Sequence, residues 1–305
     1  MSIIEKAIDR LVAEGERPKQ LAPMPETASQ GTSASPTVSG DASLQTSRAQ
    51  ETVLPIHGLG LEGMISPQTE RSRTAEEFRM IKRPLLQRAF SSDEAVASGC
   101  SNVMLVTSSV AGEGKTFTSL NLAISIAMEM DRTVLLVDAD LANPGLSRLL
   151  RVMDLPGLTE RLLDDKVDLK DLLLRTDVPK LTILPAGRRH RRSTELLASN
   201  SMKNLLDELA TRYPDRVVLL DSPPLLATSE ASVLAGQAGQ ICLVVESAKT
   251  PQFLVKEALG LIQHKDRVSL VLNKSKRELL SGPGGYYYGY RYGYGRGYGQ
   301  DDAAA

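Results

Sequence analysis

One stretch near the middle of the chain restricts its fold more than any other: an apolar run, a glycine-containing loop, a Lys-Thr pair and a helical pattern follow one another directly. The apolar run is 103–107, and the loop leads to Lys115 and Thr116. Gly112 and Gly114 allow the loop's N–H groups to converge on phosphate oxygens, and the start of a helix adds potential that favours negative charge. The stretch therefore predicts a phosphate-binding loop at the end of a buried strand.

Apolar runs and helical patterns alternate along the chain. The runs are 103–107, 133–137, 181–184, 217–220, 241–245 and 268–272, and the helical patterns are 116–129, 158–163, 194–212 and 251–263. Continuous apolar strands separated by helices imply a mostly parallel sheet. We predict an α/β fold of the P-loop NTPase type, with helices on both faces of the sheet and ligands bound beyond the carboxyl ends of the strands.

Two of these strands end in carboxylates. The run 133–137 continues into Asp138 and Asp140, and the run 217–220 continues into Asp221. A single acid at a strand end is more often a cap or turn residue. Together with the loop, however, these acids predict a nucleotide site, because carboxylates hold Mg²⁺ and accept a proton from an attacking hydroxyl.

The segments outside the core are of three kinds. Residues 1–14 have an amphipathic helical pattern, which fits either a frayed terminus or a helix that docks on a partner or membrane surface. Residues 15–73 are rich in Pro, Ser, Thr and Gly and predict a flexible linker. The domain of residues 74–274 opens with a helical pattern that Pro84 should kink or break. Residues 275–305 form a flexible tail rich in Tyr and Gly.

These motifs resemble the bacterial tyrosine kinase family over residues 74–274 and the tail. The runs 1–11, 77–86 and 194–199 look like its tyrosine autokinase subgroup from exopolysaccharide and exosortase (PEP-CTERM) loci. The resemblance implies an ATP-dependent autokinase that regulates exopolysaccharide synthesis or export. It also implies a ring-like homo-oligomer in which the tail of one subunit enters the site of another, and a membrane-embedded polysaccharide co-polymerase as activator. Glu76, Arg79 and Lys82 occupy the family's assembly motif, with lysine in place of an arginine.

We expect the following roles in the site. Lys115 and the loop amides hold ATP; Thr116, Asp140 and Asp221 organise Mg²⁺; and Asp138 orients or deprotonates the acceptor, a role that Asp140 could exchange with it. The predicted nucleotide contacts are Ala111, Gly112, Glu113, Gly114, Lys115, Thr116, Phe117 and Asn273.

The tail supplies the predicted phosphate acceptors, which are Tyr286, Tyr287, Tyr288, Tyr290, Tyr292, Tyr294 and Tyr298. Glycines between them leave the segment flexible, and each phosphate adds about −1.5 to −2 charges. A sticky low-complexity tail is one alternative. An RNA-binding tail is another, but two arginines give it little charge for nucleic acid.

Several other classes are disfavoured. A net charge of −1 predicts no nucleic-acid partner, two isolated cysteines predict no zinc site, and no apolar run reaches the roughly 20 residues of a membrane span. We expect a cytoplasmic protein that a partner recruits to the inner face of the plasma membrane. The main alternative is a ParA/MinD-like switch ATPase, but Val110 stands where that class has its signature lysine.

Overall fold

A seven-stranded sheet forms the centre of the structure, which is a computed structural model that describes residues 53–275 except 67–68, 70–71, 92–99 and 214. The predicted helix of residues 1–14, most of the predicted linker and all seven tail tyrosines lie outside the described residues. The strands lie in the order β3-β4-β2-β5-β1-β6-β7. Their bounds are β1 Val103–Ser108, β2 Thr133–Asp138, β3 Leu174–Arg175, β4 Leu181–Leu184, β5 Arg216–Asp221, β6 Gln240–Glu246 and β7 Val268–Asn273.

Every strand pair is parallel except β3 with β4. The carboxyl ends of β1, β2 and β5, which are neighbours at the centre of the sheet, therefore meet at one edge. The predicted α/β class with a mostly parallel sheet is confirmed.

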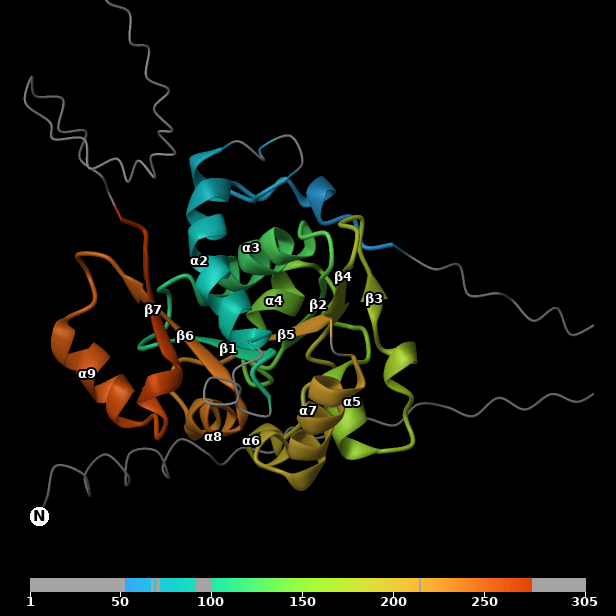
Figure 1. The fold of residues 1–305 in the computed structure, drawn as a ribbon. Helices are drawn as coiled ribbons and strands as arrows, with labels where there is room; N and C mark the ends of the chain where they lie inside the picture. Colours follow the sequence, from blue (N-terminus) through green and yellow to red (C-terminus); the bar gives the residue numbers. More distant parts are fainter. Residues whose placement is uncertain (1–52, 67–68, 70–71, 92–99, 214, 276–305) are drawn as a thin grey trace, which may run out of the picture. The chain divides into compact units, whose positions relative to one another are not determined.

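Helices cover both faces of the sheet (Figure 1). Their bounds are α2 Arg73–Ala89, α3 Lys115–Ala127, α4 Gly145–Leu149, α5 Leu158–Leu163, α6 Ser193–Leu197, α7 Asn200–Arg212, α8 Ser229–Gln237 and α9 Gln252–Gly260, with 3-10 turns η1 His57–Leu59, η3 Leu169–Asp171 and η4 Lys265–Arg267. None of the helices within the described ranges is long and apolar enough to cross a bilayer.

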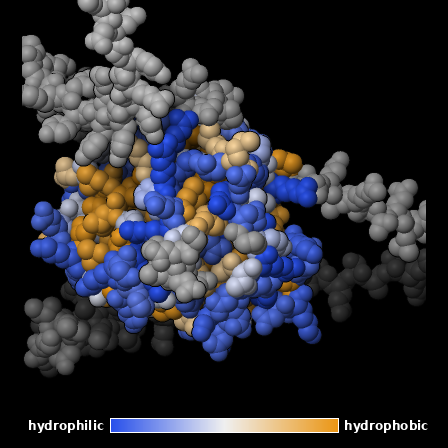
Figure 2. Space-filling model, in the orientation of Figure 1, coloured by the Kyte–Doolittle hydropathy of each residue, from blue (hydrophilic) through white to orange (hydrophobic). Residues whose placement is uncertain are grey.

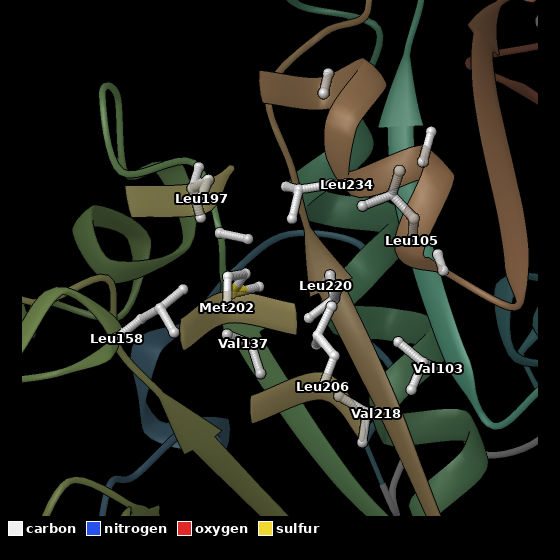
Figure 3. Packing of buried hydrophobic residues seen from close by; sticks show 14 of the residues in the cluster. Val103, Leu105, Val137, Leu158, Leu197, Met202, Leu206, Val218, Leu220 and Leu234 are labelled. Atoms are coloured by element: carbon white, nitrogen blue, oxygen red, sulfur yellow. The ribbon is translucent and has the colours of Figure 1, made fainter. Parts of the chain in front are cut away.

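Alternate residues of each central strand belong to two separate hydrophobic clusters, because successive side chains of a strand point to opposite faces. Val103 and Leu105 of β1 belong to the cluster under α5 to α8, whereas Met104 and Val106 belong to the cluster under α2 and α3. Figure 3 shows the first cluster, in which Met202 and Leu206 of α7 lie among strand residues such as Val137 and Leu220. This double burial holds the central strands, and thus their carboxyl ends, in fixed positions.

Two helix predictions need correction. The pattern 194–212 forms two helices, α6 and α7, because the Ser199 hydroxyl accepts a hydrogen bond from the Met202 N–H (3.3 Å) and starts a new helix. Of the kink or break predicted at Pro84, the break is wrong, because α2 runs on to Ala89. Pro84 lies on the exposed side, where the solvent can bond the carbonyl that proline leaves free.

The predicted linker ends earlier than expected, so its boundary at residue 73 is wrong. Residues 53–66, here called the strap, pack on the sheet domain: Ile56 and Ile65 are 0% and 1% exposed. The Ile56 N–H donates to Asp177 Oδ1 (2.9 Å), and the Ile65 N–H donates to Asn121 Oδ1 (2.8 Å). The strap has neither a helix nor a strand period, so its few apolar residues gave no recognisable signal.

Candidate active site

The phosphate-binding loop joins β1 to α3 and contains two glycines with left-handed backbone. Gly112 has φ +88° and Gly114 has φ +95°, a region that other residues rarely adopt. Gly114 is the N-cap of the 13-residue helix α3, so the helix's unpaired N–H groups face the loop. A Cβ at Gly112 would meet nothing within 4 Å, which shows that the backbone angle, not crowding, requires glycine there. The loop geometry fits a phosphate chain.

Lys115 begins α3 and reaches the end of β2. Its Nζ lies 3.2 Å from Asp140 Oδ2, and the two side chains are only 12% and 4% exposed. Asp140 Oδ1 in turn accepts the Asn143 N–H at 3.0 Å. The cation of the loop and the second of the two acids predicted after the run 133–137 thus lie together.

Asp221 lies at the end of β5 and accepts two hydroxyl groups from α3. Thr116 Oγ1 donates to its Oδ2 (2.8 Å), and Ser119 Oγ donates to its Oδ1 (2.9 Å). The sequence analysis missed Ser119, although residues three apart on a helix share a face and Thr116 had been singled out. Burial raises the pKa of Asp221, while the Lys115 charge and the two hydroxyl donors oppose the rise.

Asp138 is fully buried at the end of β2 and is held from three directions. Its Oδ2 accepts both the N–H and the Oγ–H of Ser147 (2.7 Å each), and its Oδ1 accepts the Asp140 N–H at 3.3 Å. Ser147 Oγ also accepts the Ala186 N–H at 3.0 Å, which ties the α4 residue to the loop after β4. Ser147 is a second residue that sequence reasoning missed, because α4 is too short to give a periodic pattern.

The two buried acids influence each other. Asp138 and Asp221 are directly opposite in the parallel register of β2 and β5. Burial, and then the charge of Asp221, raise the pKa of Asp138 to about 7, against the lowering effect of the Ser147 hydrogen bonds. A carboxyl group with such a pKa exchanges protons readily near neutral pH.

Glu113 does not point its side chain at the space beside the loop. Its carboxylate accepts the Val110 N–H (2.8 Å) and the Glu246 N–H (3.1 Å), and it also bonds the Thr250 hydroxyl. The side chain therefore fastens the loop to the end of β6, and only the main chain of Glu113 is available to a nucleotide.

The remaining predicted nucleotide contacts fall in different places. Ala111 is exposed on the loop, but Phe117 turns away and packs against Phe78, with ring centroids 6.4 Å apart. Asn273 Nδ2 donates to the Glu113 carbonyl (2.9 Å), and Lys274 Nζ donates to the Gly112 carbonyl (2.6 Å). The end of β7 thus lies against the loop. Lys274 was missed because nothing in the sequence distinguishes it from a surface lysine.

The three predicted assembly residues do not share one surface. Arg79 Nη1 pairs with Glu76 Oε2 (2.8 Å) on the outer side of α2. Lys82 instead turns inward: its Nζ lies 2.6 Å from both the Ser125 carbonyl and Glu129 Oε1, and its side chain is 7% exposed. In this structure the Lys82 charge is paired within its own chain, so its predicted interface role stays a prediction.

Comparison with known proteins gives a consistent picture. A family model described as an AAA domain matches residues 101–263. The tyrosine-protein kinase YwqD of Bacillus subtilis is 31% identical over 229 residues, which cover 74% of this chain and 91% of that protein. The kinase domain of the Escherichia coli tyrosine kinase ETK superposes with a TM-score of 0.60 at 26% identity, over 75% of this chain and 86% of that one.

Other relatives are much longer than this chain. The succinoglycan biosynthesis transport protein ExoP of Rhizobium meliloti is 34% identical over 219 residues, which are 67% of this chain but 25% of that protein. The chain likewise spans only 21% and 22% of two further tyrosine kinase relatives. The residues that the family model matches, 101–263, contain the loop and the strand-end acids described above.

Proposed function

The chain belongs to the bacterial tyrosine kinase family, and from that premise we propose that it is an ATP-dependent tyrosine autokinase whose acceptors are the tyrosines of its own tail. One observation carries the proposal. At the centre of one sheet edge, the glycine loop leads to Lys115, which pairs with Asp140 at 3.2 Å, and to Thr116, which bonds Asp221 at 2.8 Å, while Asp138 is the register neighbour of Asp221.

The loop and Lys115 hold the triphosphate. The N–H groups of residues 111–116 face its oxygens, and the Lys115 ammonium, now paired with Asp140, moves to the β and γ phosphates when ATP binds. We infer that Asn273 borders the nucleotide at the other side of the loop, and the hydrogen bond of its amide to the Glu113 carbonyl supports this role.

The donor set fits Mg²⁺ as well as ATP. Thr116 Oγ1, Asp140 and Asp221 supply hard oxygen ligands, and Thr116 already bonds Asp221 at 2.8 Å. When bound, Mg²⁺ neutralises charge on the phosphate oxygens. Ser119 holds the other Asp221 oxygen at 2.9 Å and so fixes the orientation of that carboxylate.

Asp138 is the general base of the proposal. Its pKa of about 7 lies well above that of an ordinary carboxyl group, so it can take the proton of a tyrosine hydroxyl at neutral pH. The phenolic oxygen bonds the γ phosphorus, the bond from that phosphorus to the β,γ-bridging oxygen breaks, and ADP leaves. Ser147 keeps one Asp138 oxygen occupied, which leaves the carboxylate in a single orientation.

The cellular role follows from the relatives by analogy. A relative that is a succinoglycan transport protein supports a role in exopolysaccharide synthesis or export. We extend the proposal to a ring-like homo-oligomer, a polysaccharide co-polymerase in the membrane as activator, and recruitment to the inner face of the plasma membrane. Glu76 and Arg79 on the outer side of α2 remain candidates for the contact between subunits.

The test is to incubate the full chain with ATP and Mg²⁺ and to map phosphotyrosine by mass spectrometry. The matched variant replaces all seven tail tyrosines by phenylalanine and keeps Tyr213. We expect phosphate on the tail of the wild type and none on the variant. Equal labelling of both proteins would refute the tail as acceptor, and no labelling of either would refute autokinase activity.

A further inference from the structure

The outer edge of β7 is open and apolar. Among the described residues β7 pairs only with β6, and Leu270 and Leu272 are 60% and 63% exposed. A groove of about 470 Å³ runs beside it, between β7 and α2, where Met80 is 62% exposed. In Figure 2 a hydrophobic patch covers the side on which Figure 1 draws β7 and α9. An edge strand of this kind is a template for a further strand.

The tail has a pattern that matches such an edge. Six of its seven tyrosines fall at even positions, and the odd positions between them are mostly glycine: the even ones are Tyr286, Tyr288, Tyr290, Tyr292, Tyr294 and Tyr298. In an extended strand, residues two apart share a face. Within residues 286–294 the run would therefore present five tyrosine rings on one face, and two glycines with Tyr287 and Arg291 on the other.

The position of the tail favours this same edge. The tail begins directly after β7, and Gly282-Pro283-Gly284-Gly285 stands between β7 and the tyrosines. Glycine and proline in such a row form turns. The 12 residues from Lys274 to Gly285 are ample for a chain reversal, and the tyrosine run is long enough to lie along the whole of β7.

We propose that residues 286–294 of the tail fold back on their own chain and pair with the open edge of β7 as an antiparallel strand, with the tyrosine rings over Leu270 and Leu272. Cross-strand pairs of an aromatic with an aliphatic residue stabilise a sheet. The N–H and C=O groups of β7 that face the open edge gain hydrogen-bond partners at the same time.

Phosphorylation would undo this pairing. A phosphotyrosine carries about −1.5 to −2 charges, which an apolar face cannot solvate, and neighbouring phosphates on one strand face repel each other. The docked strand thus stores the unmodified tail, and modification of the first tyrosines releases the rest. The docking itself needs no catalysis; only the release rests on the proposed kinase function.

Hydrogen–deuterium exchange of the full chain without ATP tests the docking. We expect amides of β7 and of residues 286–294 to exchange about tenfold more slowly in the wild type than in an edge variant, Leu270→Lys with Leu272→Lys. Met130→Lys is the matched control, because Met130 is 86% exposed and belongs to neither β7 nor the groove. It should exchange like the wild type.

A second variant tests the parity of the tyrosines at constant composition. Gly289→Tyr with Tyr290→Gly, and Gly293→Tyr with Tyr294→Gly, distribute the rings over both faces. This variant should lose the slow exchange, and so should Tyr290→Glu with Tyr292→Glu, which adds charge without any kinase reaction. The proposal would be overturned if the wild type showed no slow exchange, or if the parity variant kept it. It would also be overturned if the slow exchange vanished on dilution, because the pairing would then involve a second molecule.

Discussion

The centre of the sheet and its β7 edge put the same parallel architecture to opposite uses. At the centre, Asp138 and Asp221 are buried on both faces and bonded by hydroxyl and N–H donors. At the edge, Leu270 and Leu272 are exposed and β7 has one neighbour within the described residues. The centre can perturb a pKa and fix an orientation because it is rigid and dry. The edge can take up or release a segment because no strand of the described ranges pairs with its outer side.

Lys115→Met, at the centre of the sheet, should have the largest effect of the variants considered. Its ammonium is the one cation bonded to the strand-end acids in the described structure, so the variant should lower tail phosphorylation by about 10²- to 10³-fold or more. Rates of phosphotyrosine formation measure the loss. Lys256→Met on the exposed side of α9 is the control and should retain the wild-type rate. Comparable rates for the two variants would remove Lys115 from the mechanism.

Asp138→Asn should change how stability depends on pH. The raised pKa favours the protonated folded state, so the stability that this group contributes is complete below pH 4 and is lost as the pH rises through about 7. The wild type should therefore lose stability relative to Asp138→Asn between pH 5 and 8. The loss amounts to about 1.4 kcal/mol for each tenfold difference in the acidity of this carboxyl group between the folded and unfolded states.

Urea unfolding of metal-free protein at pH 5 and pH 8 measures this difference. Asp154→Asn serves as the control, because Asp154 is exposed and its replacement should leave the pH dependence unchanged. A constant difference between wild type and Asp138→Asn across this range would show that Asp138 ionises as an ordinary surface carboxyl group.

Lys82→Met tests whether α2, the helix that borders the edge groove, is held to the domain by a buried lysine. Because Lys82 bonds the Ser125 carbonyl and Glu129, its loss should lower the free energy of unfolding by about 1–3 kcal/mol. The exposed neighbour Arg83→Met should change it by no more than about 0.5 kcal/mol. Denaturant unfolding and sedimentation velocity check both variants. If Lys82→Met left the stability unchanged but abolished self-association, Lys82 would act at the subunit interface.

The sequence predicted the centre much better than the periphery, for a physical reason. Central strands are buried on both faces, so they read as unbroken apolar runs, and Asp138, Asp140 and Asp221 follow those runs directly. Ser147 and Lys274 reach the site from a one-turn helix and a strand end, whose roles depend on tertiary contacts.

The peripheral errors have the same origin. The strap was taken for linker because its buried Ile56 and Ile65 follow no helical or strand period. Lys82 was taken for a surface charge because the burial of a long side chain depends on the partner it finds, here Glu129 in the segment after α3. Local pattern identifies strands that carry chemistry, whereas contacts between distant segments decide the rest.

The fate of the γ-phosphoryl group tests the central claim most directly. A single turnover of γ-labelled ATP with Mg²⁺ on the full chain should place most of the label on tail tyrosines, and the Asp138→Asn variant should place almost none there. If the label left as free phosphate while the tail stayed unmodified, the strand-end acids would serve a switch ATPase and the autokinase account would be wrong.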